Sequence, residues 1–165
     1  MVTETDELYI EISLSSQLLT LFQAGRACYE TSISTAQNGP GEQQDSGCTP
    51  RGWHQIRAKI GAGCESNTVF RGRRPTGEVY TAQQAAEEPG RDWILSRILW
   101  LSGLEPGINR LGAVDTMRRY IYLHGTPDTE PMGVAKSHGC IRMRNADIIE
   151  LYELVPVHTR VLINE

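Results

Sequence analysis

The feature that most constrains the fold is a set of short runs with the period of a β-strand. Residues 8–14 have leucine or isoleucine at every second position, so one face of the run is apolar. A period of two is that of a strand with one buried face. Further strand-like runs cover residues 18–22, 27–34 and 53–60, and Ala24-Gly25 can turn the chain between the first two of these. The sequence therefore predicts a sheet that starts as an antiparallel meander.

Two segments have helical spacing instead. Residues 92–102 carry apolar side chains on a broad face, and Gly103 can end a helix there. Asn145 can cap a second helix, and Pro156 can end it. The apolar positions of this second helix are three and four residues apart: Ile148, Leu151, Tyr152 and Val155. We therefore predict two helices in a chain built otherwise from strands.

Two later strands complete the prediction. Residues 118–124 alternate and bring His124 to the end of a strand, and residues 157–163 form the last strand. Residues 61–88 are expected to be irregular, apart from a short strand near Val79. The predicted fold class is mainly β with a few helices (α+β).

Length and charge limit the kind of protein. A chain of 165 residues can bury a core of its own, so we expect residues 1–165 to form a single domain. The formal net charge of -4 gives no field that would gather a polyanion, which argues against nucleic acid as a partner. No segment of the sequence has membrane-spanning length.

The N-terminus and the cysteines bear on the compartment. Residues 1–7 are acidic and lack the basic start and apolar run of a signal peptide, so a cytoplasmic location is expected, or a periplasmic one if an export signal was removed. The four cysteines form no C-x-x-C pair, which favours free thiols: Cys28, Cys48, Cys64 and Cys140.

A cysteine and a histidine near the C-terminal end suggest nucleophilic chemistry. The thiolate is the nucleophilic form of a cysteine, so Cys140 needs a base to take its proton. His124 lies sixteen residues earlier, and a loop of that length can fold back to bring the imidazole to the thiol. This spacing permits the pair without requiring it, because a buried cysteine beside a structural histidine is the commoner arrangement.

The neighbours of Cys140 suggest supporting roles. Gly139 lets the backbone approach a substrate closely, and the amides at and beside Cys140 can hold the oxyanion of a tetrahedral intermediate. His138 can donate to that oxyanion or fix the loop. The carbonyl of Gly125 can orient His124 in place of a carboxylate.

The central motif resembles the signature of the YkuD-type L,D-transpeptidase catalytic domain, in which serine or threonine precedes His-Gly-Cys and a histidine lies upstream. The residues that carry the resemblance are Ser137-His138-Gly139-Cys140-Ile141-Arg142-Met143 and His124-Gly125. Flanking matches at 34–35, 49–52, 145–147, 155–157 and 161 extend it over most of the chain.

The resemblance implies a β-rich, β-sandwich-like fold and acyl transfer on peptidoglycan stem peptides. A thioester would form on the cysteine after attack on the carbonyl of an L-centre that precedes a D-residue. An amine acceptor would then give a cross-link, whereas water would give carboxypeptidase activity. The family's cysteine, base histidine, second histidine and arginine correspond to Cys140, His124, His138 and Arg142. Substrate binding is expected from Arg142, Ser137, Arg73 and Arg74.

The expected function is L,D-carboxypeptidase removal of terminal D-alanine from tetrapeptides in wall recycling, because no export signal is seen. Peptidoglycan cross-linking by an L,D-transpeptidase is the first alternative. A zinc site formed by His124, His138 and Cys140 is an alternative of another class, and a non-catalytic peptidoglycan-binding module is a third. The partners are expected to be stem peptides or muropeptides, with no cofactor and no metal, and the oligomeric state is left open.

Overall fold

The computed structural model describes residues 7–165, so the acidic start considered above lies outside it except for Glu7. The strands are β1 (Leu8–Ser13), β2 (Leu18–Gln23), β3 (Arg26–Ser32), β4 (Gly52–Ile60), β5 (Thr68–Arg71), β6 (Arg74–Val79), β7 (Ile94–Gly103), β8 (Tyr122–Thr126), β9 (Ile141–Arg144) and β10 (Arg160–Asn164). The helices are α1 (Ala82–Glu87), the short 3-10 helix η2 (Gly112–Val114) and α2 (Asn145–Leu154). The predicted fold class, mainly β with a few helices, is confirmed.

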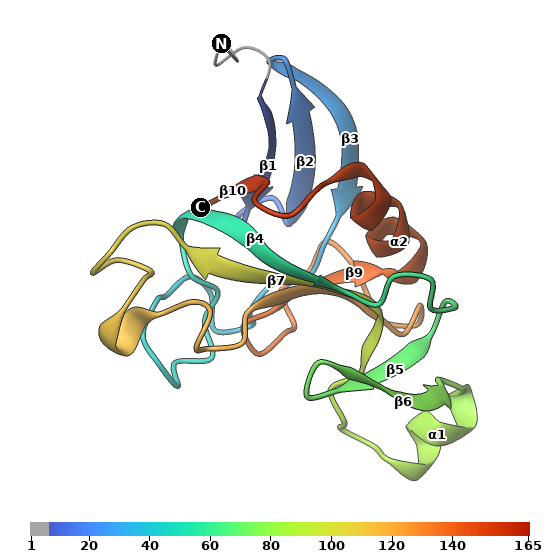
Figure 1. The fold of residues 1–165 in the computed structure, drawn as a ribbon. Helices are drawn as coiled ribbons and strands as arrows, with labels where there is room; N and C mark the ends of the chain where they lie inside the picture. Colours follow the sequence, from blue (N-terminus) through green and yellow to red (C-terminus); the bar gives the residue numbers. More distant parts are fainter. Residues whose placement is uncertain (1–6) are drawn as a thin grey trace.

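All of these strands belong to one curled sheet (Figure 1). The order along it is β3-β2-β1-β10-β4-β7-β5-β6, and β8 joins β7 to β9. A bridge between Ser34 and Arg142 connects the segment after β3 to β9, which brings the two ends of the curl together. The helix α2 packs against β7, β8 and β9. The curl therefore encloses its own core instead of facing a second sheet.

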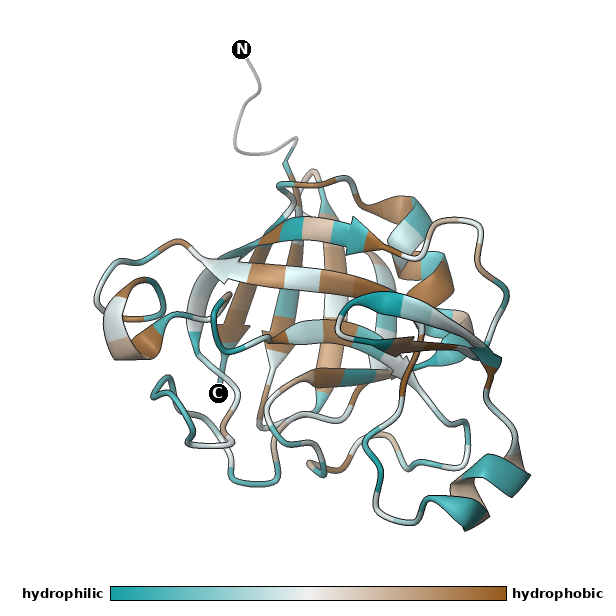
Figure 2. Cartoon of the chain, turned by 60° about the horizontal axis from the view of Figure 1, so that its bottom comes forward, coloured by the Kyte–Doolittle hydropathy of each residue, from teal (hydrophilic) through white to brown (hydrophobic). Residues whose placement is uncertain are grey.

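The core fills the inside of the curl. Its buried side chains come from the strands and from α2, and include Ile10, Ile12, Leu19, Leu21, Ile56, Leu99, Leu101, Leu123, Ile141, Met143, Ile148, Leu151, Val161 and Ile163. Figure 2 shows hydrophobic positions alternating with polar ones along the strands, while α1 is mostly polar. The alternation in the sequence is thus the alternation between core and solvent.

The predicted N-terminal meander is confirmed. β1 pairs with β2 and β2 with β3, both antiparallel. The turn between β2 and β3 has positive φ at Ala24 (51°) and at Gly25 (74°), the conformation that a two-residue hairpin loop needs.

The helix predicted over 92–102 is wrong, because these residues form β7. This strand pairs with β4 and β5, one after the other, along one edge and with β8 along the other edge. One face of β7 contributes Leu99 and Leu101 to the main core, while Leu95 and Ile98 join smaller clusters elsewhere. A strand buried on both faces shows no alternation in its sequence, and an irregularity between Leu95 and Ile98, with positive φ at Ser96, disturbs the period further.

Three other expectations need correction. The region 61–88 contains the hairpin β5–β6 and the helix α1, and Figure 1 shows these together at one corner of the molecule. The strand predicted over 118–124 starts only at Tyr122, because Tyr120 has a positive φ of 56° in a turn. Asn145 does not cap α2: Arg144 holds the cap position, and the Asn145 side chain is buried in a polar network.

Among residues 7–165, no helix combines the length and the apolar character needed to cross a membrane.

Candidate active site

The strands β8 and β9 bring the predicted site residues onto one face. They run parallel, with Leu123 opposite Ile141 and His124 opposite Arg142. Because side chains alternate along a strand, Leu123 and Ile141 point into the core, and His124 and Arg142 point to the other face. Cys140 directly precedes β9 and is two residues from Arg142, so it lies on the face of His124. The sheet register therefore places the histidine and the cysteine on one face, where no hydrogen bond joins Cys140 Sγ to His124 Nε2 among the described residues.

The Cys140 thiol lies against the backbone where β8 begins. The amide of Tyr122 donates a hydrogen bond to Sγ at 3.3 Å, and the thiol donates to the carbonyl of Tyr120 at 3.3 Å. Burial raises the pKa of Cys140 to about 12. The thiol is therefore neutral in this arrangement and needs a base when it reacts.

His124 is fully buried, and its two ring nitrogens differ. Nδ1 lies 2.7 Å from the carbonyl oxygen of Gly125, which can only accept, so Nδ1 carries the proton. Nε2 is buried without a hydrogen-bond partner among the described residues. Burial lowers the pKa of His124, while the negative charge of Asp92 opposes that shift. The imidazole is thus neutral, with the lone pair of Nε2 unused.

The turn before Cys140 is held by hydroxyl groups. The Ser137 hydroxyl donates to the carbonyl of Cys140 at 2.6 Å and accepts from the amide of Gly139 at 3.2 Å. Thr49 donates to the carbonyl of Gly139 at 2.8 Å. Gly139 has φ of +135°, and a Cβ there would lie 3.2 Å from Ile121 Cδ1, so a side chain would be strained. Ser137, expected to bind substrate, has its hydroxyl engaged within the turn.

Asp92 ties together the two other polar residues of the motif. Arg142 is buried and donates from Nη2 to Asp92 at 2.9 Å, with Glu130 3.9 Å from its Nη1. His138 has 74% of its side chain exposed, and its Nδ1 lies 3.9 Å from Asp92. Sequence reasoning missed Asp92, because it placed this residue at the start of a helix with a packing role. The acid two residues before the buried strand β7 was the available signal.

Only one of the two arginines expected from the β5–β6 hairpin reaches the site. Arg73 lies in the hairpin turn and donates to the hydroxyl of Tyr122 at 3.0 Å. Its guanidinium also lies over the rings of Trp100 and Tyr120, 4.9 and 4.8 Å from their centroids. Arg74 is exposed on β6, opposite Arg71 in the hairpin register.

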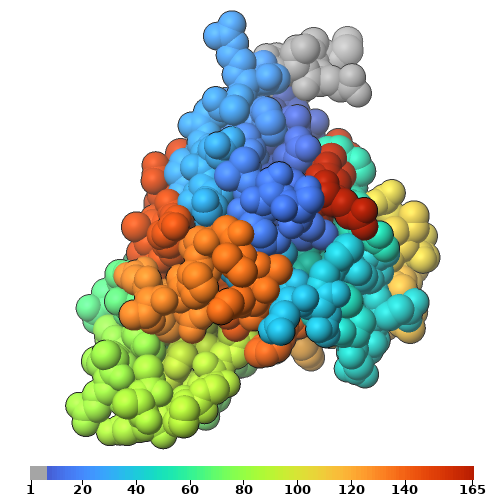
Figure 3. Space-filling view, turned by 180° about the vertical axis from the view of Figure 1, so that it is seen from behind, coloured from blue at the N-terminus to red at the C-terminus, as the bar shows by residue number. Residues whose placement is uncertain are grey.

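His138 lines two hollows. One, of about 300 Å³, also contains Asp92, Glu130 and Arg142 and reaches the α1 segment. The other, of about 310 Å³, contains Arg119, whose guanidinium donates to the carbonyl of Cys48 at 2.6 Å. Burial lowers the pKa of Arg119. In Figure 3 the segment before Cys140, in orange, lies between the segment that contains Cys48, in cyan, and the yellow-green corner.

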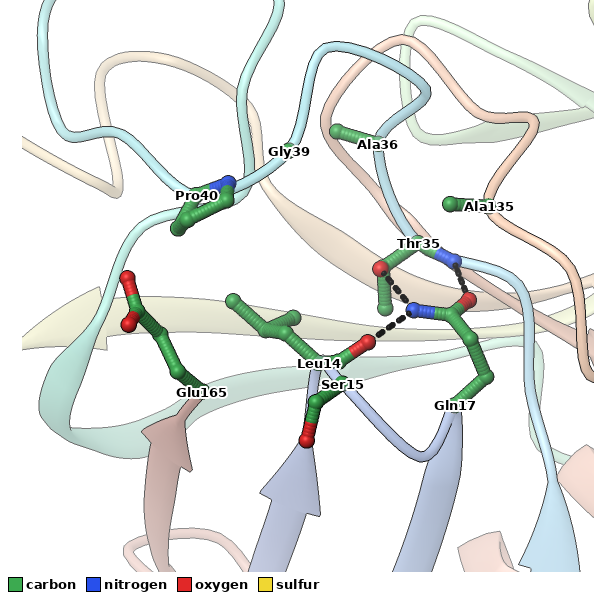
Figure 4. Close-up of a pocket in the computed structure, with 9 residues that line it drawn as sticks. All are labelled: Leu14, Ser15, Gln17, Thr35, Ala36, Gly39, Pro40, Ala135 and Glu165. Carbon is green, nitrogen blue, oxygen red and sulfur yellow. Dashed lines mark hydrogen bonds between the residues drawn. The ribbon is translucent and has the colours of Figure 1, made fainter.

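A third hollow, of about 270 Å³, is mostly apolar. It is lined by the turn between β1 and β2 and by the segment that follows β3. Gln17 lines it, but its side chain is fully engaged: it donates to Thr35 and Leu14 and accepts from the Thr35 amide, as Figure 4 shows. These bonds support the loop that pairs with Ser137 through Ala36. We assign this hollow a structural role.

The donors of the alternative zinc site do not converge. Within residues 7–165, no three His, Cys, Asp or Glu side chains are grouped as metal ligands. His124 uses Nδ1 on Gly125, and the exposed His138 turns toward Asp92.

Comparison with known proteins now adds to this geometry. The sequence model of the YkuD family, described as the L,D-transpeptidase catalytic domain, matches residues 7–163. The chain belongs to this family. The putative L,D-transpeptidase YkuD of Bacillus subtilis is 37% identical over 90 residues, which are 54% of this chain and 44% of that protein. The probable L,D-transpeptidase YbiS of Escherichia coli K12 is 51% identical over 43 residues, 26% of this chain and 14% of that protein. This L,D-transpeptidase-family chain thus matches less than half the length of these relatives.

Solved structures have the same fold. An L,D-transpeptidase from Mycobacterium smegmatis superposes with a TM-score of 0.57 at 16% identity, covering 96% of this chain and 59% of that one. The catalytic domain of the Enterococcus faecium L,D-transpeptidase gives 0.52 at 17% identity, covering 98% of this chain and all of that domain. At these identities the likeness concerns the fold, and the family assignment rests on the sequence match.

Proposed function

We propose that Cys140 is the nucleophile of a cysteine-dependent acyl transfer on peptidoglycan stem peptides, with His124 as its base. The observation that carries this proposal is the buried, unpartnered Nε2 of a neutral imidazole on the same face as the thiol. Leaving a buried polar atom without a partner costs about 1–3 kcal/mol, a cost expected where the atom has a chemical task.

The first half of the reaction forms a thioester. His124 Nε2 accepts the Sγ proton as the sulfur attacks the carbonyl carbon of the L-centre. This order of events follows from a thiol with a raised pKa beside an imidazole with a lowered one, because neither group is charged beforehand. The tetrahedral intermediate then collapses. The C–N bond to D-alanine breaks, and the leaving amine accepts from Nε2 the proton that came from Cys140.

The second half releases the acyl group. A water molecule attacks the thioester carbonyl while Nε2 removes its proton, and Cys140 recovers its thiol. The carbonyl of Gly125 keeps the proton of His124 on Nδ1 throughout, so Nε2 stays available. The Gly139 amide is engaged by Ser137, which leaves the amide of Cys140 as the oxyanion donor that we favour, with His138 beside it.

Hydrolysis is our first choice for the second half, because the exposed His138 leaves the site accessible to water. Cross-linking is the alternative, and the two separate hollows beside His138 support it, since one could hold each peptide. Arg142 and Arg73 are the cations that we propose for substrate carboxylates. Arg74 is a weaker candidate because its side chain is exposed on the far strand of the hairpin.

The test is mass spectrometry of a muropeptide tetrapeptide incubated with the protein, with and without an amine acceptor. Loss of D-alanine alone supports the carboxypeptidase, and a joined product supports the transpeptidase. Cys140→Ala should abolish both, whereas Cys28→Ala, which changes an exposed cysteine on β3, should have no effect. Undiminished turnover by Cys140→Ala would overturn the assignment of the nucleophile.

A further inference from the structure

A fourth hollow, of about 250 Å³, is lined by residues of β4, of the end of β7 and of the loop that follows β7. Figure 1 shows these three segments. Three arginines line it: Arg57 on β4, and Arg110 and Arg118 in the loop after β7. Asp115 is the acidic residue among the lining residues. None of the residues that line this hollow belongs to the site around Cys140.

The three guanidinium groups have no carboxylate partner. Within residues 7–165, no Asp or Glu carboxylate oxygen lies within 4.0 Å of a guanidinium nitrogen of these three arginines. Asp115 does not neutralise them by direct contact, because its two carboxylate oxygens accept from the amides of Leu111 (2.7 Å) and Arg118 (3.0 Å). Arg26, Arg71 and Arg74 also lack an ion pair within these residues, so what sets the three arginines apart is that they line one hollow.

The backbone directs these side chains to one place. Arg57 is the extra residue of a β-bulge, since Ile56 pairs with Leu101 and Ala58 pairs with Trp100. Bulges re-aim side chains, and this one leaves Arg57 exposed at the hollow. Leu111 has a positive φ of 70°, rare for a branched residue, and the hydrogen bond from its amide to Asp115 holds the loop beside Arg110.

The charges define the class of ligand. Three guanidinium groups and one carboxylate sum to +2, in a chain whose formal net charge is -4. The three arginines are exposed, so water screens part of their mutual repulsion, and an anion bound between them would remove more of it. A phosphate monoester carries a charge of about -2 at neutral pH and accepts forked hydrogen bonds from arginine, whereas a carboxylate supplies about -1.

We propose that this hollow binds the dianionic phosphate of a phosphorylated ligand. The loop that lines the hollow continues to the thiol. The carbonyl of Met117, which lines the hollow, accepts a hydrogen bond from Trp100, and three residues later the carbonyl of Tyr120 accepts one from the Cys140 thiol. The site does not depend on the function proposed for Cys140, and its test does not use activity.

The test is calorimetric titration of the Cys140→Ala protein with inorganic phosphate and with glucose 6-phosphate, at constant ionic strength. Saturable binding is expected, stronger at pH 8 than at pH 6, where phosphate is less charged. Tighter binding of the sugar phosphate identifies a phosphorylated molecule as the ligand, and equal binding identifies free phosphate. Each of Arg57→Gln, Arg110→Gln and Arg118→Gln should weaken binding about tenfold, since each removes a charge-assisted contact.

Arg26→Gln and Arg71→Gln are the matched controls, because both change exposed arginines outside the hollow. They should bind phosphate as the parent does. Sodium acetate at the same ionic strength should not saturate the site. Absence of saturable phosphate binding, or equal binding by all five variants, would overturn the proposal. Circular dichroism and the unfolding midpoint of each variant establish that it is folded.

Discussion

Two histidines are fully buried, His54 on β4 and His124 on β8. Their Nδ1 atoms have the same kind of hydrogen-bond partner, but their Nε2 atoms differ. In each, Nδ1 lies against a nearby backbone carbonyl: that of Gly52 at 3.0 Å for His54, and that of Gly125 at 2.7 Å for His124. The Nε2 of His54 is bonded to Thr116 at 2.9 Å, but the Nε2 of His124 has no partner within the described residues.

The difference separates a structural histidine from one available for chemistry. Both rings are kept neutral by burial, which lowers the pKa of each. His54 has both nitrogens engaged, Nδ1 within β4 and Nε2 on Thr116 in the loop after β7, so it contributes to stability. His124 leaves a basic nitrogen without a partner on the face of Cys140, at some expense of stability, as the base that we propose would need. Both histidines fall in strand-like runs, and only the resemblance of the motif around His124 sets it apart in the sequence.

The largest expected effect comes from replacing each ring by an amide of similar polarity. His124→Gln should lower kcat by about 10²–10⁴-fold, because glutamine cannot accept the thiol proton. His54→Gln should leave kcat per folded molecule within a few-fold of the parent. Turnover of a tetrapeptide, corrected for the folded fraction, measures both. Equal losses in the two variants would remove the distinction.

Acid should destabilise the fold through His54. Its pKa is about 4 in the folded protein, against about 6.5 in the unfolded chain, so the unfolded chain binds the proton more readily. The stability linked to this group is complete above pH 6.5 and is lost as the pH falls from there to about 4, by up to about 3 kcal/mol. Urea unfolding at pH 7 and pH 4 should show a smaller loss in His54→Gln. An unchanged loss would assign acid sensitivity to other groups.

Each histidine also has a buried asparagine that holds the backbone beside it. Asn145 donates to the carbonyl of Thr126 at 2.9 Å and lies so close to Gly125 that a Cβ there would come within 2.6 Å of its Oδ1. Asn109 donates to the carbonyls of Arg51 and Trp53 at 3.0 Å, next to His54. Asn145 is thus placed to position the Gly125 carbonyl that orients His124.

Asn145→Ala should therefore lower kcat about tenfold, in addition to a stability loss of about 1–3 kcal/mol from the unpaired groups. Asn109→Ala should cost similar stability with kcat per folded molecule unchanged. Steady-state kinetics beside denaturant unfolding separates the two effects. If kcat fell equally in both variants, Asn145 would have only a structural role.

The smallest effect concerns the charge near each ring. Asp92 raises the pKa of His124, and Glu42 raises that of His54, against the larger effect of burial. Asp92→Asn should lower the pKa of His124 further and move the acid limb of the pH–rate profile to lower pH by a fraction of a unit. Glu42→Gln should leave that limb in place. A shift to higher pH in Asp92→Asn would contradict this account.

Elements with one buried face were predictable from the sequence, and those with two were not. β1 and β2 alternate because the curl of the sheet buries one side of each, so their pattern records the core directly. β7 is covered on both faces and was mistaken for a helix. The irregular stretch 61–88 was read from its glycines and prolines, but its hairpin β5–β6 depends on pairing with β7.

The sequence by itself determined the family, through the residues of the Ser-His-Gly-Cys motif and the upstream histidine, and it named the candidate site residues. The tertiary structure decided which groups around them are free. It engaged the Ser137 hydroxyl and the Gly139 amide in the turn, paired Arg142 with Asp92, and left Nε2 of His124 without a partner. The physical reason is that hydrogen bonding and burial depend on partners far apart in the chain, which the sheet register brings together and local spacing does not encode.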